Sequence, residues 1–273
     1  MKRITSIAAI AILASVPGTA LAEGRTAAPS YTLTNTTYTQ NFDSLARSGD
    51  NNSNLPAGFQ IVEKGTGSSA NGRYEAGSGT SNAGDVYSFG ANGSSDRALG
   101  SLGSGSVAPT YFGGIFTNGL DATISDLTFS YDGEQWRAGN SNDDGLTFQY
   151  SLDATQVDNG TWTTISSLIF NPLVLAGNTA LNGNLAANRV SLNGSASGLN
   201  IGSGSSFGFR WVDQNSSGSD HGLGVDNFSL TAGLAAAGGV PEPATWALMI
   251  LGFGFAGGAL RRRNRGFARL ALA

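Results

Sequence analysis

The chain has 273 residues, a formal net charge of −4, one histidine and no cysteine. The lack of cysteine excludes disulfide bonds, thiol catalysis and zinc sites with cysteine ligands. All but one of the 19 acidic residues lie between residues 23 and 239, and this acidic body argues against nucleic acid as a partner, because phosphate binding needs a basic face.

Residues 1–22 have the pattern of a secretory signal peptide. Two basic residues precede an apolar run over 4–16, and Ala20-Leu21-Ala22 places small residues where signal peptidase cuts, before Glu23. A retained N-terminal anchor is the alternative, although the apolar run is short for a membrane span. The pattern predicts export by the general secretion machinery and cleavage by signal peptidase.

Residues 23–231 form the predicted ectodomain, in which short alternating runs recur without a helical period. Clusters of Gly, Ser and Asn between the runs are typical of turns. Residues 171–187 have no clear pattern and are expected to hold one helical turn. About ten to twelve strands without intervening helices predict an all-β, two-sheet sandwich. The expected strands are 31–42, 59–62, a short one near 73–74, 85–89, 98–102, 111–116, 124–131 with a continuation at 135–137, 146–152, 162–169, 207–212 and 223–230.

The two ends of this body, Gln40–Leu45 and Gly224–Leu230, resemble the first and last strands of extracellular jelly-roll domains. The resemblance implies a jelly-roll-like sandwich in which the terminal strands pair. The pieces 96–101, 133–137 and 219–222 resemble an uncharacterised body common among secreted proteins with a C-terminal sorting signal. That second resemblance implies no known activity.

A flexible linker is expected over 232–239, followed by an uncharged stretch over 244–260. The stretch would be roughly 25 Å long as a helix, with Trp246 near one end, where an indole ring prefers the membrane interface. An Arg-rich segment, 261–265, follows it, and cationic flanks stay cytoplasmic. The pattern predicts one C-terminal transmembrane helix over 244–260, with a short tail over 266–273. A buried core helix is the alternative.

The order of parts over residues 240–265 closely resembles the PEP-CTERM sorting signal in its Trp-Ala variant. The residues that carry the resemblance are Val240, Pro241, Glu242, Pro243, Trp246, Arg261, Arg262 and Arg263. The resemblance implies recognition by exosortase, a transpeptidase-like membrane enzyme of Gram-negative bacteria that make exopolysaccharide and biofilm. It also implies membrane anchoring before processing, cleavage near Pro-Glu-Pro, and a final place in the cell envelope, on the outer surface or outside the cell. The prolines suit a cleavage site because they keep the segment extended.

The residues that could carry out catalysis are few. A Ser-His-Asp triad would need His221, for which a loop position held by Asp220 or by the backbone is the alternative. A glycoside hydrolase needs two carboxylates, and Glu134 and Glu75 are the conceivable acids. For Glu134 the alternative is an ion pair with Arg137 or Arg97.

Calcium and carbohydrate are the two ligands that the composition favours. If the terminal strands pair, Asp43 and Asp226 approach each other and would need a cation or a raised pKa. The segments 142–145 and 213–215 are further oxygen-rich loops, which ordinary Asx turns also explain. Five aromatic side chains could offer stacking faces to a glycan, with core packing as the alternative for most of them: Trp136, Trp162, Trp211, Tyr74 and Tyr111. Trp136 and Trp211 are the candidate glycan contacts.

The sequence thus predicts an exported, non-enzymatic structural or adhesive protein of the envelope or extracellular matrix, associated with exopolysaccharide. A calcium-dependent carbohydrate-binding module is the first alternative. A carboxylate-dependent glycoside hydrolase is the second.

Overall fold

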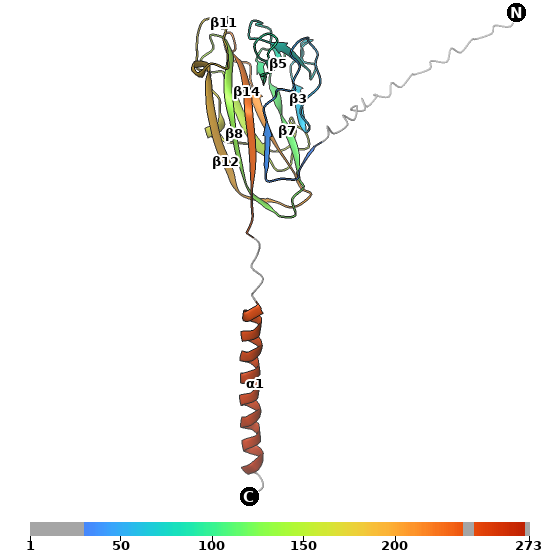
Figure 1. Ribbon diagram of the computed structural model, residues 1–273, viewed down its shortest axis with the longest axis vertical. Helices are drawn as coiled ribbons and strands as arrows, with labels where there is room; N and C mark the ends of the chain where they lie inside the picture. Colours follow the sequence, from blue (N-terminus) through green and yellow to red (C-terminus); the bar gives the residue numbers. More distant parts are fainter. Residues whose placement is uncertain (1–29, 237–242, 271–273) are drawn as a thin grey trace, which may run out of the picture.

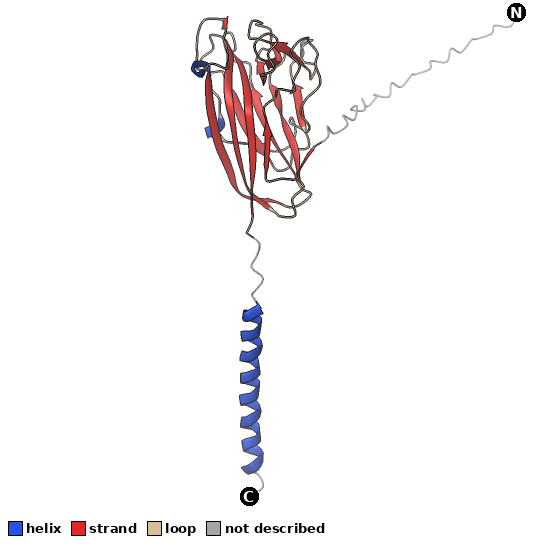
Figure 2. Ribbon diagram, viewed as in Figure 1, coloured by secondary structure: helices blue, strands red, loops and turns tan. Residues whose placement is uncertain are grey.

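The computed structural model describes residues 30–236 and 243–270, which form a β body and one helix (Figures 1 and 2). The body contains two β-sheets that face each other across a shared core. The all-β, two-sheet sandwich predicted from the alternating runs is therefore confirmed. The helix, α1, spans Pro243–Leu270.

The smaller sheet has the order β1-β7-β13-β9-β10, and β3 also pairs with β7. Its central strands β7 and β13 are antiparallel, with Trp211 opposite Phe112. The strands of this sheet are β1 (Tyr31–Leu33), β3 (Phe59–Glu63), β7 (Thr110–Asn118), β9 (Leu146–Ser151), β10 (Thr163–Thr164) and β13 (Ser206–Asp213).

The larger sheet has the order β11-β8-β14-β6-β5-β4, with β12 also paired to β8 and β2 to β14. The pairing of β2 with β14 joins the first and last strands of this sheet, as the jelly-roll resemblance implied. The strands are β2 (Thr37–Gln40), β4 (Tyr74–Gly77), β5 (Asp85–Phe89), β6 (Ala98–Leu102), β8 (Ile124–Ala138), β11 (Thr179–Ala180), β12 (Arg189–Ile201) and β14 (Gly222–Leu234).

Aromatic side chains from both sheets fill the space between them. Phe209 of β13 stacks on Phe228 of β14 with ring centroids 4.6 Å apart, and Phe129 of β8 lies 4.9 Å from Phe148 of β9. All four rings are fully buried. Since a buried aromatic side chain removes a large apolar area from water, these contacts hold the two sheets together without disulfide bonds.

A β-bulge in β14 resets which residues face the core. Asp226 pairs with Asp132, but Ser229 pairs with Ser130, so β14 carries one extra residue there. Asn227 takes up the extra residue at φ 50°, a left-handed conformation that asparagine tolerates. As a result, the residues of β14 that face the main core are odd-numbered before the bulge and even-numbered after it. Asp226 therefore lies on the outer face of the sheet.

Four segments differ from the strands expected from the sequence. The expected strand 31–42 bends after Leu33, so its two halves, β1 and β2, join different sheets. The expected strand 162–169 shortens to β10, because a 3-10 turn, η1 (Ser166–Leu168), buries Leu168. β14 runs on into the expected linker as far as Leu234. β12 has no counterpart among the expected strands, and it pairs with the edge of β8 through a backbone rich in Ser, Asn and Gly.

Candidate functional site

The sorting-motif residues lie at the start of α1 and just before it. Pro243 is the first residue of the helix, where proline costs no hydrogen bond. Trp246 is 52% exposed, and Arg261 is exposed too. The other motif residues lie outside the described part of the chain or, for the two arginines, have only their backbone described: Val240, Pro241, Glu242, Arg262 and Arg263.

The segment expected to cross a membrane, 244–260, lies within α1. Across the described residues, no helix is long and apolar enough to span a bilayer.

The two tryptophans predicted to contact a glycan are both buried. Trp211 is 0% exposed and packs in the main core, edge-on to Phe228 at 5.4 Å. Trp136 is 2% exposed and stacks on Phe89 in a small second core on the outer side of the larger sheet. Neither ring can stack on an external sugar, so core packing is the reading that the structure supports.

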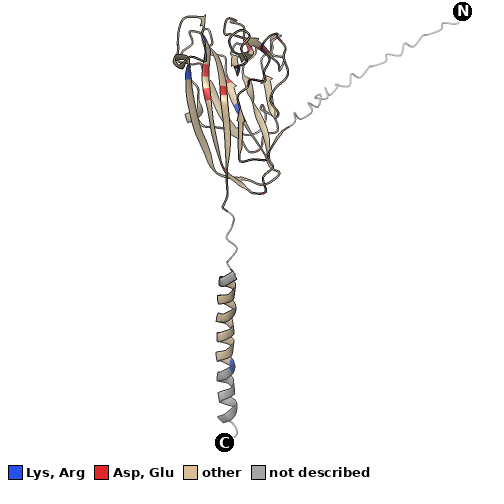
Figure 3. Cartoon of the chain, in the orientation of Figure 1, with Lys and Arg blue, Asp and Glu red and all other residues tan. Residues whose placement is uncertain are grey.

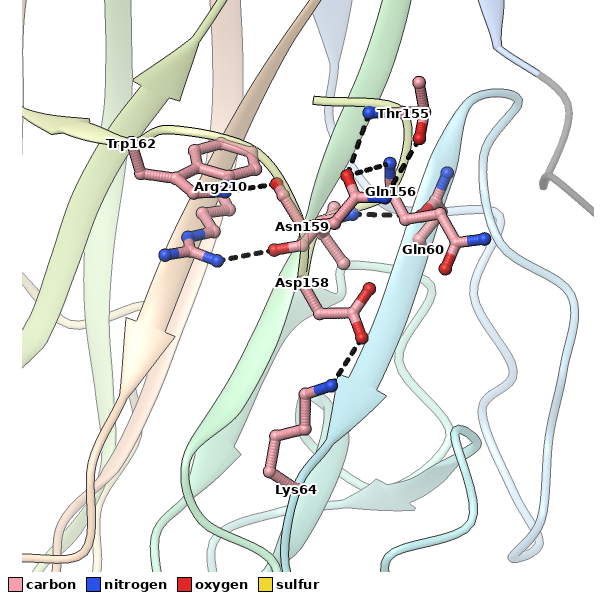
Figure 4. A network of polar contacts seen from close by, with 9 residues as sticks. Gln60, Lys64, Thr155, Gln156, Asp158, Asn159, Trp162 and Arg210 are labelled. Carbon is pink, nitrogen blue, oxygen red and sulfur yellow. Dashed lines mark hydrogen bonds and ion pairs between the residues drawn. The ribbon is translucent and has the colours of Figure 1, made fainter. Parts of the chain in front are cut away.

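Aromatic rings that are not fully buried lie on the outer face of the smaller sheet. The Arg210 guanidinium sits over two of them. It lies 4.1 Å from the Trp162 ring (Figure 4) and 4.4 Å from the Tyr111 ring. Gln149 Oε1 accepts a hydrogen bond from Arg210 Nε at 2.9 Å, and the Val157 carbonyl accepts one from Nη1 at 2.7 Å. These contacts fix a flat arginine between two half-buried aromatic side chains.

The loop over 152–162 supplies one wall of this face and is held by hydrogen bonds along its length. Asn159 Oδ1 accepts from the backbone N–H groups of Thr155 and Gln156, both at 3.0 Å, and its carbonyl accepts from Trp162 Nε1 (Figure 4). An ion pair of 2.5 Å between Lys64 and Asp158 closes the loop onto β3. Since the loop is fixed, the position of the Trp162 ring is fixed too.

Acidic side chains gather on the outer face of the larger sheet, where Figure 3 shows acidic positions on neighbouring strands in the upper half of the view. Burial, together with the charges of Glu134, Asp96 and Asp43, raises the pKa of Asp226 to about 8. Asp43 Oδ1 also accepts the backbone N–H of Arg97 at 3.3 Å. The terminal-strand pairing thus brings Asp43 and Asp226 into electrostatic contact, and a calcium ion between them stays a prediction.

Glu134 is neither exposed nor paired with an arginine. It is 1% exposed, and its Oε2 accepts a hydrogen bond from Trp136 Nε1 at 3.0 Å. Arg137 and Arg97, the expected partners, donate instead to backbone carbonyls. Burial raises the Glu134 pKa to about 7. A carboxyl group this enclosed cannot reach a polysaccharide chain.

The single histidine is part of the buried structure at one end of the sandwich. His221 Nδ1 accepts the Gly139 N–H at 2.8 Å, so the ring is neutral and Nε2 donates to the Ser141 carbonyl at 2.9 Å. Its backbone N–H donates to Asp144 Oδ2. The backbone therefore holds this histidine, as one of the two interpretations of the sequence expected.

Three more aspartates meet at the same end of the sandwich. Asp144 and Asp213 come from the two loops marked as oxygen-rich in the sequence, and Asp220 lies just before β14. Burial raises the pKa of Asp213 well above its usual value, and the charges of Asp144 and Asp220 add to that effect. Burial, followed by the Asp144 charge, raises the pKa of Asp220 to about 6. The sequence marked each loop alone but held no signal that they converge.

Comparison with protein families identifies the C-terminal region. The PEP-CTERM protein-sorting motif matches residues 239–263, which include the junction before α1 and most of the helix. The chain therefore carries an exosortase-type sorting motif after its β body, and the resemblance stated from the residues is confirmed. No curated protein matches this chain.

Solved structures share the sandwich architecture with low identity. The xylan-binding domain CBM22-1 from Paenibacillus barcinonensis is 11% identical over 73% of this chain and 95% of that domain, with a TM-score of 0.36. The K1 cleaved adhesin domain of Lys-gingipain from Porphyromonas gingivalis W83 is 13% identical over 72% of this chain and 98% of that domain, with a TM-score of 0.39. At these TM-scores the likeness carries no argument about this chain.

Trp162 and Tyr111 were among the aromatic side chains expected to offer stacking faces, but Arg210 between them was not predicted from the sequence. The signal was nevertheless present in Phe207-Gly208-Phe209-Arg210-Trp211, where a charged residue alternates with aromatic ones. Strict alternation places that arginine on the face opposite the core. Its partner Trp162 comes from a distant loop, and no sequence pattern joins the two.

Proposed function

We propose that the chain is an exported surface protein that exosortase processes at its sorting motif, and that its sandwich binds a polysaccharide without catalysis. The observation that carries the binding role is the Arg210 guanidinium stacked on Trp162 and Tyr111 on an outer sheet face. Aromatic side chains offer apolar area to the C–H faces of sugars, and neighbouring amides and guanidinium groups donate to hydroxyl groups.

A neutral polymer fits this face better than a polyanion. Two of the Arg210 nitrogens already donate to Gln149 and Val157, and Asp158 neutralises Lys64. The body around the face carries nearly all of the acidic residues of the chain, so it repels an anionic chain at long range. We therefore expect hydroxyl-rich, uncharged sugars as ligands.

The non-catalytic part of the proposal rests on the burial of the candidate acids. Glu134 is enclosed beside Trp136, and His221 is held by backbone groups. A glycoside hydrolase needs two carboxyl groups that both reach the scissile bond. In the described residues, the candidate acid pair from the sequence, Glu134 and Glu75, does not meet that requirement, since Glu134 is 1% exposed.

Binding is tested with the purified full chain in detergent and three soluble neutral polysaccharides: a β-glucan, a galactan and a dextran. Calorimetry is expected to show saturable binding to at least one of them and none to polygalacturonate. In Trp162→Ala the dissociation constant should rise about 30-fold, as for loss of an aromatic anchor. Trp246→Ala removes an exposed tryptophan of α1 and is the matched control, expected to bind as the wild type does.

Because Trp162 is half-buried, a second variant separates lost binding from lost structure. Arg210→Lys keeps the charge but loses the flat stacked group. It should bind at least about tenfold more weakly, with the circular dichroism spectrum unchanged. No saturable binding to any of the three polymers, or unchanged binding by both variants, would overturn the polysaccharide role.

A further inference from the structure

A pocket opens at the end of the sandwich where β6 and β13 finish and β14 begins. It has a volume of about 280 Å³, and Gly103, Asn215 and Asp220 are among the residues that line it. Three oxygen atoms converge on the side of Gly103 where any other residue would carry its Cβ. That Cβ position is 2.7 Å from Asp220 Oδ2, 2.8 Å from the Gln214 carbonyl oxygen and 3.1 Å from Asp213 Oδ1.

One of these oxygens is buried and has no hydrogen-bond partner. Asp213 is 1% exposed, and its Oδ2 accepts a hydrogen bond from Ser101 Oγ at 2.6 Å. Its Oδ1 accepts none and points toward the shared space in front of Gly103. Since leaving a carboxylate oxygen unpaired in the interior is unfavourable, we expect Asp213 Oδ1 to bind a ligand that does not belong to the chain.

The cationic side chain that lines the pocket forms no ion pair with these carboxylates. Arg137 lines the pocket, but its guanidinium donates to the carbonyls of Gly79, Thr80 and Asn178. Within the described part of the chain, an ion pair joins Lys64 and Asp158, at another site. Asp220 Oδ1 accepts a hydrogen bond from the Ser216 N–H at 3.1 Å. The other carboxylate oxygen, Asp220 Oδ2, faces Gly103.

We propose that this end of the sandwich binds one Ca²⁺ ion, held by Asp213 Oδ1, Asp220 Oδ2 and the Gln214 carbonyl oxygen. Calcium takes six to eight oxygen ligands, and it accepts carboxylates, backbone carbonyls and water together. The pocket leaves room for the water ligands. Among the described residues, no group of three or more His, Cys, Asp or Glu side chains is placed to ligate one ion, so this site relies on two carboxylates, a backbone carbonyl and water.

Asp144 adds negative charge without acting as a ligand. Its Oδ1 accepts the Gly145 N–H and its Oδ2 accepts the His221 N–H, so both oxygens are already partnered. The absence of a side chain at residue 103 is also part of the site, because a methyl group there would meet all three ligand oxygens. The three proposed ligands lie at the end of β13 and on the segment that joins β13 to β14, strands of different sheets, so a bound ion would link the ends of the two sheets.

The proposal is tested on the purified full chain in detergent, after treatment with EDTA and removal of the chelator. Titration with CaCl₂ in a calorimeter should show binding with a dissociation constant of about 0.1–1 mM, the range of extracellular calcium modules. In 10 mM CaCl₂ the melting temperature should rise by about 5 °C relative to EDTA. The same concentration of MgCl₂ should raise it less, and an equal rise would overturn the assignment to calcium.

Asp220→Asn locates the ion and separates binding from a purely structural role. The asparagine keeps Oδ1 for Ser216, and its amide group can donate to Asp213 Oδ1. Calcium binding should therefore weaken about tenfold or more, while the melting temperature in EDTA stays at or above that of the wild type. Asp121→Asn removes an exposed aspartate elsewhere and should bind calcium as the wild type does.

A second variant protects the test against misfolding of the first. Asp213→Asn should lose calcium binding in the same way, with an amide hydrogen directed at Asp220. No calcium-dependent heat or melting shift in the wild type would overturn the proposal. Wild-type calcium binding in both variants, or an equal drop in melting temperature with and without calcium, would overturn this location.

Discussion

At the scale of single residues, burial decided which predicted side chains can act. Alternation along β8 and β14 predicts two faces, but here both faces of the larger sheet are covered, one by the main core and one by the small core around Trp136. Alternation along β8 therefore could not predict that Trp136, on the outer face, is buried. The burial of Trp211 was predictable from alternation along β13, because Trp211 shares the inward face with Phe207 and Phe209.

The buried Glu134 side chain is expected to make the stability of the folded protein depend on pH. Its pKa is raised by burial to about 7, whereas an unfolded glutamate ionises near 4.3. The folded state therefore binds more protons than the unfolded state between these values, so this group makes stability fall as the pH rises from about 4 to about 7. Below about pH 4 the stabilisation that comes from burying the protonated Glu134 is fully present.

Glu134→Gln should remove that part of the pH dependence. The glutamine keeps an acceptor for Trp136 Nε1, so at pH 4.5 the variant and the wild type should unfold with similar free energies. At pH 8 the variant should be more stable by about 2 kcal/mol, measured by urea denaturation at both pH values. Equal differences at the two pH values would contradict a buried, raised-pKa carboxyl group.

At the scale of elements, β8 and β14 determine the shape of the larger sheet. The fifteen residues of β8 pair with both β12 and β14, and the bulge at Asn227 sets the register of the second half of β14. The expected strands 124–131 and 135–137 proved to be one strand, because Gly133 sits under the Phe170 ring and needs no bend. β12 was missed since only Val190, Leu192 and Ala196 mark its alternation among small polar residues.

The bulge residue offers a test of this element. Asn227 has φ 50° and donates from its side chain to Asp132 Oδ2 at 3.0 Å. A β-branched residue resists that conformation, so Asn227→Val should destabilise the protein by about 1–3 kcal/mol. Asn227→Gly adopts it freely and should cost less than about 1 kcal/mol. Denaturation midpoints of the two variants give the comparison, and equal losses would argue against strain at the bulge.

At the scale of the whole molecule, the sandwich and the sorting motif are successive parts of one chain. Composition, alternation and the order of Pro-Glu-Pro, apolar stretch and arginines were enough to predict the β body and the motif, because both are written in local patterns. The arginine between two rings and the oxygen atoms around Gly103 were not predictable, because each is assembled from segments far apart in the sequence.

The most direct test of the account is the mass of the chain recovered from the surface of a bacterium that contains an exosortase, compared with a strain that lacks the enzyme. With exosortase present, mass spectrometry should find a chain that ends near Pro241 and has lost α1, while the strain without exosortase should keep residues up to Ala273. Recovery of the chain intact through Ala273 from the surface of the exosortase-containing strain would contradict the account.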